Sequence, residues 1–308
     1  MQLKASAPGS LMLLGEYAVL HGKQALVCAI DQRIEVILTP RTDKKIFIES
    51  DLYGQYHTDL LALKIEKPFQ FVLGALLQYQ VKLKRGCDIA ITSTFSDQVG
   101  LGSSAAVTVA TLAALISWLN IRMSPLDLVR QGKQVIKQVQ GIGSGADIAA
   151  SVYGGLVGYQ AQPLFAEKFH HLHPLTVLYA GYKTPTVDAI KRVQQSFSAY
   201  SSLFLHITNS IGQCATEGIQ LVRKMDWAKL GHIMNIQQGM MESLGVSDVS
   251  LTKMVNTLRE QPGMLGVKIS GSGLGDCVVG LGESAHDHNG FQRIAINMSA
   301  QGVQCEKI

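Results

Sequence analysis

Apolar and polar positions alternate or recur with two different periods along the first half of the chain. Strict alternation over 33–39 (RIEVILT) and 87–94 (CDIAITST) predicts half-buried strands. Residues 3–40 contain further short apolar runs separated by glycine turns, which predict more strands. Residues 68–83 have the length and the spacing of a helix. This part of the chain is therefore expected to contain both strands and helices.

Further helices are predicted where glycine or serine precedes a regular apolar pattern. After Gly102, nearly every position up to about Leu119 is apolar, so this helix should be buried on all sides. Residues 124–141 are amphipathic, with Ser124 as the N-cap and proline at the first helical position. A glycine-rich turn, a short helix and a strand are expected within 141–159.

The pattern is interrupted at 162–175 (QPLFAEKFHHLHPL) by two prolines and clustered polar residues. We place a domain boundary there, so that residues 1–165 form the first domain and residues 166–308 the second. In the second domain the pattern predicts a strand at 175–182, helices over 186–260, strand–glycine loop–strand over 263–282, a helix at 288–302 and a short final strand. The fold class expected from this order is α+β.

Composition narrows the class of protein. Of the 308 residues, 47% are hydrophobic and 16% charged, which is typical of a well-cored globular enzyme and excludes a disordered chain. The net charge of +4 comes without a dense Lys/Arg block, so no nucleic-acid partner is expected. The longest apolar run, 105–119, is shorter than the roughly 20 residues of a membrane span. Five scattered cysteines without a CxxC pair favour reduced thiols and a cytoplasmic location.

Three glycine-rich loops carry the candidate chemistry: 100–104 (GLGSS), 141–147 (GIGSGAD) and 270–275 (SGSGLG). Glycine lets a backbone approach a ligand closely, and the N–H groups at a helix start bind anions, so a bound phosphate is expected. Each loop alone is also typical of a tight turn. None ends in the Gly-Lys-Ser/Thr of a Walker A loop, and the G-x-G-x-x-A match at 100–105 lacks the helix-then-strand context of a dinucleotide fold.

In order along the chain, 7–22 (APGSLMLLGEYAVLHG), 100–106 (GLGSSAA) and 268–281 (KISGSGLGDCVVGL) resemble the three motifs of the GHMP kinase superfamily. The resemblance covers nearly the whole chain. It implies the GHMP kinase fold, with a ribosomal protein S5 domain 2-like first domain, a ferredoxin-like second domain and an active site between them. It also implies ATP and Mg²⁺ as cofactors and a small molecule as the phosphoryl acceptor.

The resemblance further implies roles for single residues. Asp147 matches the catalytic Asp that orients or deprotonates the acceptor hydroxyl, although an N-cap Asp would fit the same position. Ser104 matches the hydroxyl that binds Mg²⁺, although a plain helix cap would also fit. The residues expected to bind the nucleotide are Gly100, Leu101, Gly102, Ser103, Ser104, Ala105, Gly271, Ser272 and Gly273. Those expected to contact the acceptor are Glu16, Tyr17, Lys183 and Thr186, with a buried structural carboxylate as the alternative for Glu16.

Two features depart from the pattern of the family. Ser10 stands where mevalonate and phosphomevalonate kinases usually carry Lys, which removes a cation from the site. The lysines that could substitute for it are Lys4, Lys23 and Lys183. Upstream of Asp147, where mevalonate kinases place an Mg²⁺-binding Glu, the chain has Gln134 and Gln138 and no Glu.

The acceptor is the open part of this interpretation. Segments 20–26 (LHGKQAL), 183–186 (KTPT) and 241–251 (MESLGVSDVSL) are similar to mevalonate kinases. Segments 15–19 (GEYAV), 140–155 (QGIGSGADIAASVYGG) and 270–277 (SGSGLGDC) are similar to phosphomevalonate kinases. We expect mevalonate as the acceptor, with phosphomevalonate or a catalytically weak nucleotide sensor as alternatives. Family members are often homodimers, which extends that expectation to this chain. The histidines of 170–173 (HHLH) and 285–288 (AHDH) lack a cysteine partner at metal spacing, so no zinc site is expected.

Overall fold

A mostly antiparallel sheet organises the first half of the chain. In the computed structural model, which describes residues 1–96, 99–284 and 290–308, its strands follow the order β12-β1-β2-β5-β3-β4, and the β6–β7 hairpin pairs with β2. Only the β3–β5 pair of this sheet is parallel within the described part of the chain. The strands are β1 (Leu3–Leu14), β2 (Gln24–Pro40), β3 (Lys45–Ser50), β4 (Gly54–Asp59), β5 (Cys87–Ser93), β6 (Leu156–Ala161), β7 (Leu164–Phe169) and β12 (Gln304–Lys307).

Four α-helices pack against this sheet and against one another, and together with the sheet they form the hydrophobic core of the first half. They are α1 (Gln70–Tyr79), α2 (Ser103–Trp118), α3 (Pro125–Gln140) and α4 (Ala146–Tyr153), with short 3₁₀ turns at Ala18–His21, Leu60–Ala62 and Gln80–Lys82. Helix α2 packs on β1 and β2 and against α1, α3 and α4, so it is surrounded as its apolar sequence predicted. Ser124 caps α3 by accepting the N–H of Asp127, which confirms that predicted helix start.

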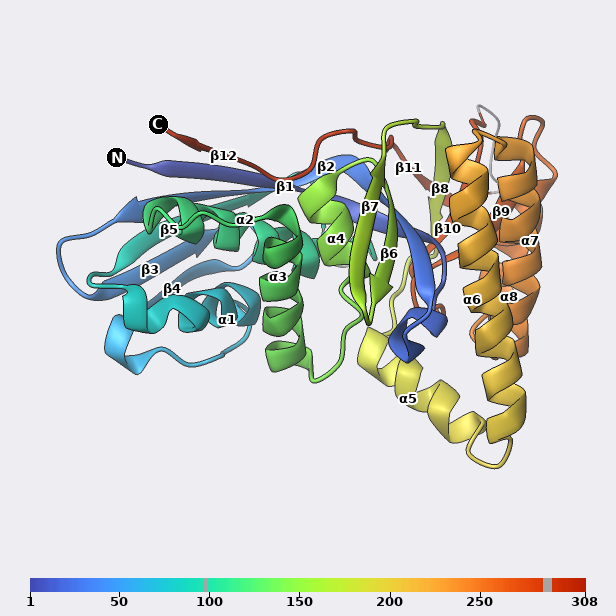
Figure 1. Cartoon of the computed structure of the whole chain (residues 1–308), viewed down its shortest axis with the longest axis horizontal. Coiled ribbons are helices and arrows are strands. Elements are labelled where there is room, and N and C mark those ends of the chain that lie inside the picture. Colours follow the sequence, from blue (N-terminus) through green and yellow to red (C-terminus); the bar gives the residue numbers. More distant parts are fainter. Residues whose placement is uncertain (97–98, 285–289) are drawn as a thin grey trace.

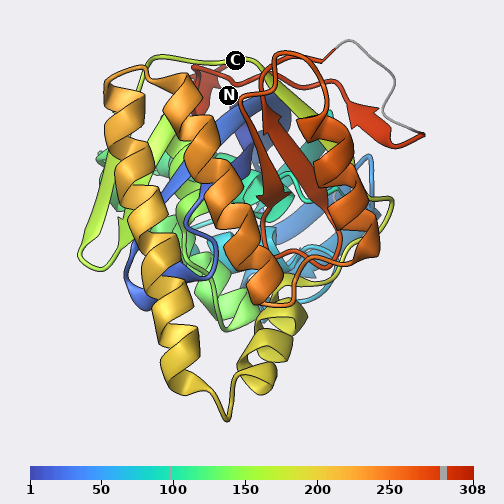
Figure 2. The ribbon, with the colours of Figure 1, turned by 90° about the vertical axis from the view of Figure 1, so that its right-hand side faces the viewer.

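The second half is a smaller antiparallel sheet with helices beside it (Figure 1). Its strands follow the order β11 (Gln292–Ile294), β8 (Leu175–Tyr179), β10 (Cys277–Leu281) and β9 (Gly266–Ser270). Its helices are α5 (Thr186–Ser196), α6 (Ser201–Arg223), α7 (Trp227–Ser243) and α8 (Val249–Arg259). Figure 2 shows α6 and α7 side by side and α5 meeting α6 at the tip of the molecule. Helices α7 and α8 pack on β9, and α6 also packs on β2 of the first half.

The structure confirms the α+β class and corrects two predicted segments. Residues 290–302 contain no helix; β11 pairs there with β8, and Met298 bridges Ile30, because pairing with a neighbouring strand satisfies this backbone. Within 162–175, where we expected an interruption, β7 forms a regular hairpin with β6 and ends at Phe169. The proposed boundary at residues 165 and 166 thus falls inside β7.

The two ends of the chain lie side by side in the first sheet, as Figure 1 shows. Strand β12 pairs with β1, so the last residues return across the molecule to the strand that begins it. Among the described residues, no helix is long and apolar enough to cross a membrane.

Candidate functional site

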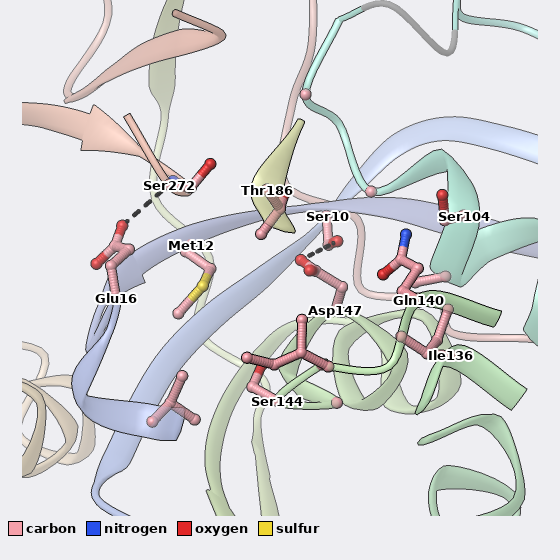
Figure 3. A pocket seen from close by; sticks show the side chains of 18 of the residues that line it. Ser10, Met12, Glu16, Ser104, Ile136, Gln140, Ser144, Asp147, Thr186 and Ser272 are labelled. Atoms are coloured by element: carbon pink, nitrogen blue, oxygen red, sulfur yellow. Dashed lines mark hydrogen bonds between the residues drawn. The ribbon is translucent and has the colours of Figure 1, made fainter. Parts of the chain in front are cut away.

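A pocket of about 190 Å³ lies where the two halves of the chain meet (Figure 3). Strand β1 and α4 contribute from the first half, and the start of α5 and the loop between β9 and β10 contribute from the second. The residues predicted from the sequence that line it are Glu16, Tyr17, Gly100, Gly102, Ser103, Ser104, Ala105, Asp147, Lys183, Thr186, Gly271 and Ser272. Folding thus gathers residues that are up to 256 positions apart in the sequence.

The first glycine loop enters α2 through a backbone that only glycine adopts easily. Gly102 is the N-cap with a φ of 73°, and a Cβ atom there would lie 2.2 Å from Ser10 Oγ. The N–H of Ser10 donates to the carbonyl of Leu101 at 2.9 Å, which fixes the loop to β1. Leu101 itself is buried outside the pocket lining. The helix start, with Ser103 and Ser104 in its first turn, therefore faces the pocket with its N–H groups, an arrangement that attracts anions.

Asp147 lies in the first turn of α4, and its side chain lies next to that of Ser10 of β1 (Figure 3). The hydroxyl of Ser10 donates to Asp147 Oδ1 at 2.8 Å. Burial raises the pKa of the Asp147 carboxyl, while this hydrogen bond and the charge of Lys183 act in the opposite direction. Gly145 is the N-cap of α4, so the reading of Asp147 as an N-cap residue is wrong. The alternative of Ser104 as a cap is wrong for the same reason, because Gly102 caps α2.

Glu16 is a buried carboxylate with partners on both oxygens. Lys268, which is fully buried on β9, forms an ion pair with Glu16 Oε1, and Gln237 of α7 donates to Oε2. The N–H of Gly271 also donates to Glu16 Oε1 at 3.4 Å. These contacts connect the segment after β1 in the first half to β9 and α7 in the second half. Glu16 thus has the contacts expected of a buried structural carboxylate, which was the alternative role considered for it. Glu16 also lines the pocket.

Tyr17, a residue of the first motif, forms a hydrogen bond that holds the third glycine loop in place. Tyr17 donates its hydroxyl to the carbonyl of Ser272 at 2.6 Å, and Tyr17 itself has a φ of 62°. Gly273, with a φ of 72°, packs its backbone against Val246 behind the pocket wall. The loop over Gly271 and Ser272 is therefore held above the pocket by contacts from two directions.

Lys183 is the single Lys or Arg among the described residues that line the pocket. It is exposed, and its charge acts on the carboxylates of both Asp147 and Asp276. Lys4 instead pairs with Glu35 on the neighbouring strand, and neither Lys4 nor Lys23 lines the pocket. Of the three lysines considered as substitutes for a cation at position 10, Lys183 is the one that the fold brings to the site.

A second pocket of about 150 Å³ begins where the first one ends. The two share Ser103, Ser104 and Lys183, so a ligand at the start of α2 can extend into both. Tyr53, Phe69 and Phe71 line the second pocket with aromatic and apolar surface. Flat aromatic walls next to an anion site suit a planar base attached to phosphates.

The sequence did not single out several residues that line the first pocket, among them Ile136, Gln140 and Asp276. Ile136 and Gln140, four positions apart on α3, line it on the side of Ser104, whereas Gln134 and Gln138 do not (Figure 3). Asp276 lines it from the end of the third glycine loop. Its position directly after that loop was the available signal.

No three His, Cys, Asp or Glu side chains gather into a metal-binding group within residues 1–96, 99–284 and 290–308. The stretch 170–173 lies in an irregular segment after β7, and the stretch 285–288 lies outside the described residues. Residues with oxygen-bearing side chains do line the pocket, among them Ser104, Asp147 and Asp276.

Comparison with known proteins gives one consistent family. Residues 70–155 match the family described as "GHMP kinases N terminal domain", and residues 219–299 match "GHMP kinases C terminal". The mevalonate kinase of Pyrococcus furiosus is 31% identical over 306 residues, which cover 91% of this chain and 89% of that protein. Among solved structures, the Lin0012 protein of Listeria innocua is 21% identical and superimposes with a TM-score of 0.88 over 100% of both chains. The mevalonate kinase of Methanococcus jannaschii is 21% identical, with a TM-score of 0.79 over 96% of this chain and 98% of that chain.

Proposed function

The chain belongs to the GHMP kinase family of phosphotransferases, and we propose that it transfers the γ-phosphoryl group of ATP to a hydroxyl of mevalonate. The observation that carries the proposal is the juxtaposition of Asp147, held by Ser10, with the glycine-rich start of α2 in one pocket. Curated relatives that span most of this chain at about 30% identity carry the name mevalonate kinase, which supports this acceptor.

The nucleotide is assigned to the two connected pockets. Its phosphates lie at the start of α2, where the N–H groups of the first turn and the helix dipole stabilise negative charge. Its base and ribose extend from Ser103 and Ser104 into the aromatic second pocket. Gly271 and Ser272 cover the phosphates from the second half, and Glu16 and Tyr17 hold that cover in place.

Asp147 is assigned as the base. In the transfer, the acceptor hydroxyl gives its proton to the Asp147 carboxylate, its oxygen forms a bond to the γ-phosphorus, and the bond from that phosphorus to the β–γ bridging oxygen breaks to release ADP. The raised pKa of Asp147 makes it a better proton acceptor than an exposed carboxylate. Lys183 is assigned to offset the charge on the transferred group, because it is the single cation among the described lining residues.

The donor set of the pocket fits the Mg²⁺ ion that the family resemblance implies. Mg²⁺ prefers carboxylate and hydroxyl oxygens, and Ser104, Asp147 and Asp276 present them here. One carboxylate oxygen of this set, Asp276 Oδ1, is buried without a hydrogen-bond partner among the described residues. Bound Mg²⁺ would neutralise phosphate charge; we assign Ser104 as one residue that holds it.

The charge of the pocket favours mevalonate over phosphomevalonate. Mevalonate brings one carboxylate, whereas phosphomevalonate adds a phosphate group that needs further cations. Lys183 is the single Lys or Arg among the described lining residues. Apolar residues from both halves of the chain also line the pocket, among them Met12, Val19, Leu20, Ile142, Ile148, Val187 and Ile190.

The test is ADP release in a coupled assay with Mg-ATP and either mevalonate or phosphomevalonate. We expect turnover with mevalonate that Asp147→Asn lowers by at least about a hundredfold, within the range for loss of a general base. Turnover only with phosphomevalonate would overturn the acceptor assignment. ATP binding without turnover on either acceptor would favour the nucleotide-sensor alternative.

A further inference from the structure

Asp276 is a buried carboxylate that takes no part in the proton and phosphoryl transfers described above. It ends the third glycine loop, is 5% exposed and lines the pocket. The backbone of Gly100 is a hydrogen-bond partner of this carboxyl, whereas its Oδ1 atom has no hydrogen-bond partner among the described residues. Burying a carboxylate oxygen without a partner destabilises a fold, so a carboxylate kept in such a place points to a ligand that satisfies it.

The backbone holds this carboxylate firmly against the phosphate loop. The N–H of Asp276 donates to the carbonyl of Tyr182, and the carbonyl of Asp276 accepts the N–H of Ala180, both at 2.9 Å. Asp276 has a φ of 64°, a conformation that is strained for residues other than glycine. A Cβ atom at Gly100 would lie only 2.6 Å from Asp276 Cγ, so the carboxylate touches the loop that binds phosphate.

The opposite wall of the pocket supplies no carboxylate. Helix α3 contributes Ile136 and Gln140 on the side of Ser104, and its glutamines 134 and 138 lie elsewhere. This is the segment where the family resemblance led us to look for an Mg²⁺-binding Glu. A carboxylate ligand missing from α3 can be supplied by another element that lines the pocket, and Asp276 is such a carboxylate.

The charges of the pocket also require a cation. Glu16 is paired with the buried Lys268, which leaves Asp147 and Asp276 against Lys183. A nucleotide triphosphate next to Asp276 adds several negative charges to this site. In a partly buried site such charges repel strongly unless a cation lies between them.

We propose that Asp276 is a ligand of the divalent cation that accompanies the nucleotide, and that it acts from the second half of the chain together with the Ser104 hydroxyl of the first half. This inference rests on the nucleotide site of the proposed function but not on the identity of the acceptor. It makes the cation a link between the two halves of the protein, since Asp276 and Ser104 belong to different domains of the fold.

The proposal predicts that the affinity for the metal falls while the affinity for the metal-free nucleotide does not. In Asp276→Asn, the affinity for Mn²⁺, measured by electron paramagnetic resonance in the presence of a non-hydrolysable ATP analogue, should fall at least about tenfold. The affinity for the same analogue in EDTA, measured by calorimetry, should stay equal or rise, because a negative charge beside the phosphates is gone. Asp226→Asn, which changes a carboxylate at the start of α7 that does not line the pocket, should leave the Mn²⁺ affinity within about twofold.

A second variant separates this role from a structural one. Asp276→Gly removes the carboxylate and relieves the backbone at a φ of 64°, so it should repeat the effect of Asp276→Asn on Mn²⁺. If both variants weaken metal-free and metal-bound nucleotide alike, Asp276 only supports the loop and the proposal is wrong. An unchanged Mn²⁺ affinity in both variants would also overturn it. Neither measurement uses an acceptor. If the two variants show the expected effects but the wild-type protein does not phosphorylate mevalonate, only the proposed function is overturned.

Discussion

Replacing Ser10 with alanine should move the pH at which the enzyme loses activity in acid. Ser10 donates to Asp147 Oδ1 at 2.8 Å, and this bond stabilises the charged carboxylate against the effect of burial. Ser10→Ala removes the donor and leaves the carboxylate in place. The pKa of Asp147 should therefore rise further above the ordinary value, so that the base is protonated at a higher pH.

The size of the shift follows from the energy of the bond. A hydrogen bond to a charged group contributes about 1.5–3 kcal/mol, and a change of one pKa unit corresponds to about 1.4 kcal/mol. The acidic limb of kcat/KM for the acceptor should thus move up by about one to two pH units. On that limb, activity relative to wild type should fall by about tenfold to a hundredfold, whereas above both pKa values the two proteins should differ less.

The assay is the pH profile of kcat/KM between about pH 5 and pH 9, followed by ADP release. Ser151→Ala is a matched control, because Ser151 is a buried hydroxyl that donates to the carbonyl of Pro8 at 2.8 Å and does not line the pocket. It should lower stability without moving the acidic limb. A uniform loss of activity in Ser10→Ala at every pH, with the limb unmoved, would refute the reasoning that this hydroxyl sets the charge state of Asp147.

Three other variants test the remaining parts of the site. Lys268→Met leaves Glu16 as a buried charge without its cation, so the free energy of unfolding measured in urea should fall by about 3–5 kcal/mol. Adding Glu16→Gln should recover part of this loss. If the losses of the two single variants simply add in the double variant, the ion pair is contradicted. Gly102→Ala should weaken ATP binding, measured by calorimetry, by at least about tenfold, because the φ of 73° and the close contacts at this residue exclude a Cβ. Gly239→Ala is the control: this residue lies inside α7 with open space around it, so the change should stabilise the fold by up to about 1 kcal/mol. Lys183→Met should lower kcat by about a hundredfold to a thousandfold, as loss of a charge-stabilising donor does; a change in KM for ATP alone would point to a binding role.

Local patterns determined the parts of this protein that depend on neighbours in sequence. The buried helix α2, the capped start of α3 and the turns around the glycine loops follow from apolar spacing, caps and positive φ angles, each decided within a few residues. The motif around Asp147 could be read for the same reason. The helix predicted over 288–302 is absent from residues 290–302, where Gln292–Ile294 pair instead with β8, which lies far away in sequence.

Only the tertiary structure decided how the candidate site is completed. Ser10 and Asp147 are 137 positions apart, and Lys268 and Glu16 are 252 apart, so no local pattern announces either contact. The same holds for Asp276 against Gly100, and for Lys183 as the lysine that reaches the pocket. The sequence by itself determined which residue types and loops are available for phosphate chemistry. Their partners and charges depend on how the two halves pack, because hydrogen bonds and ion pairs form between groups that folding brings within a few ångström.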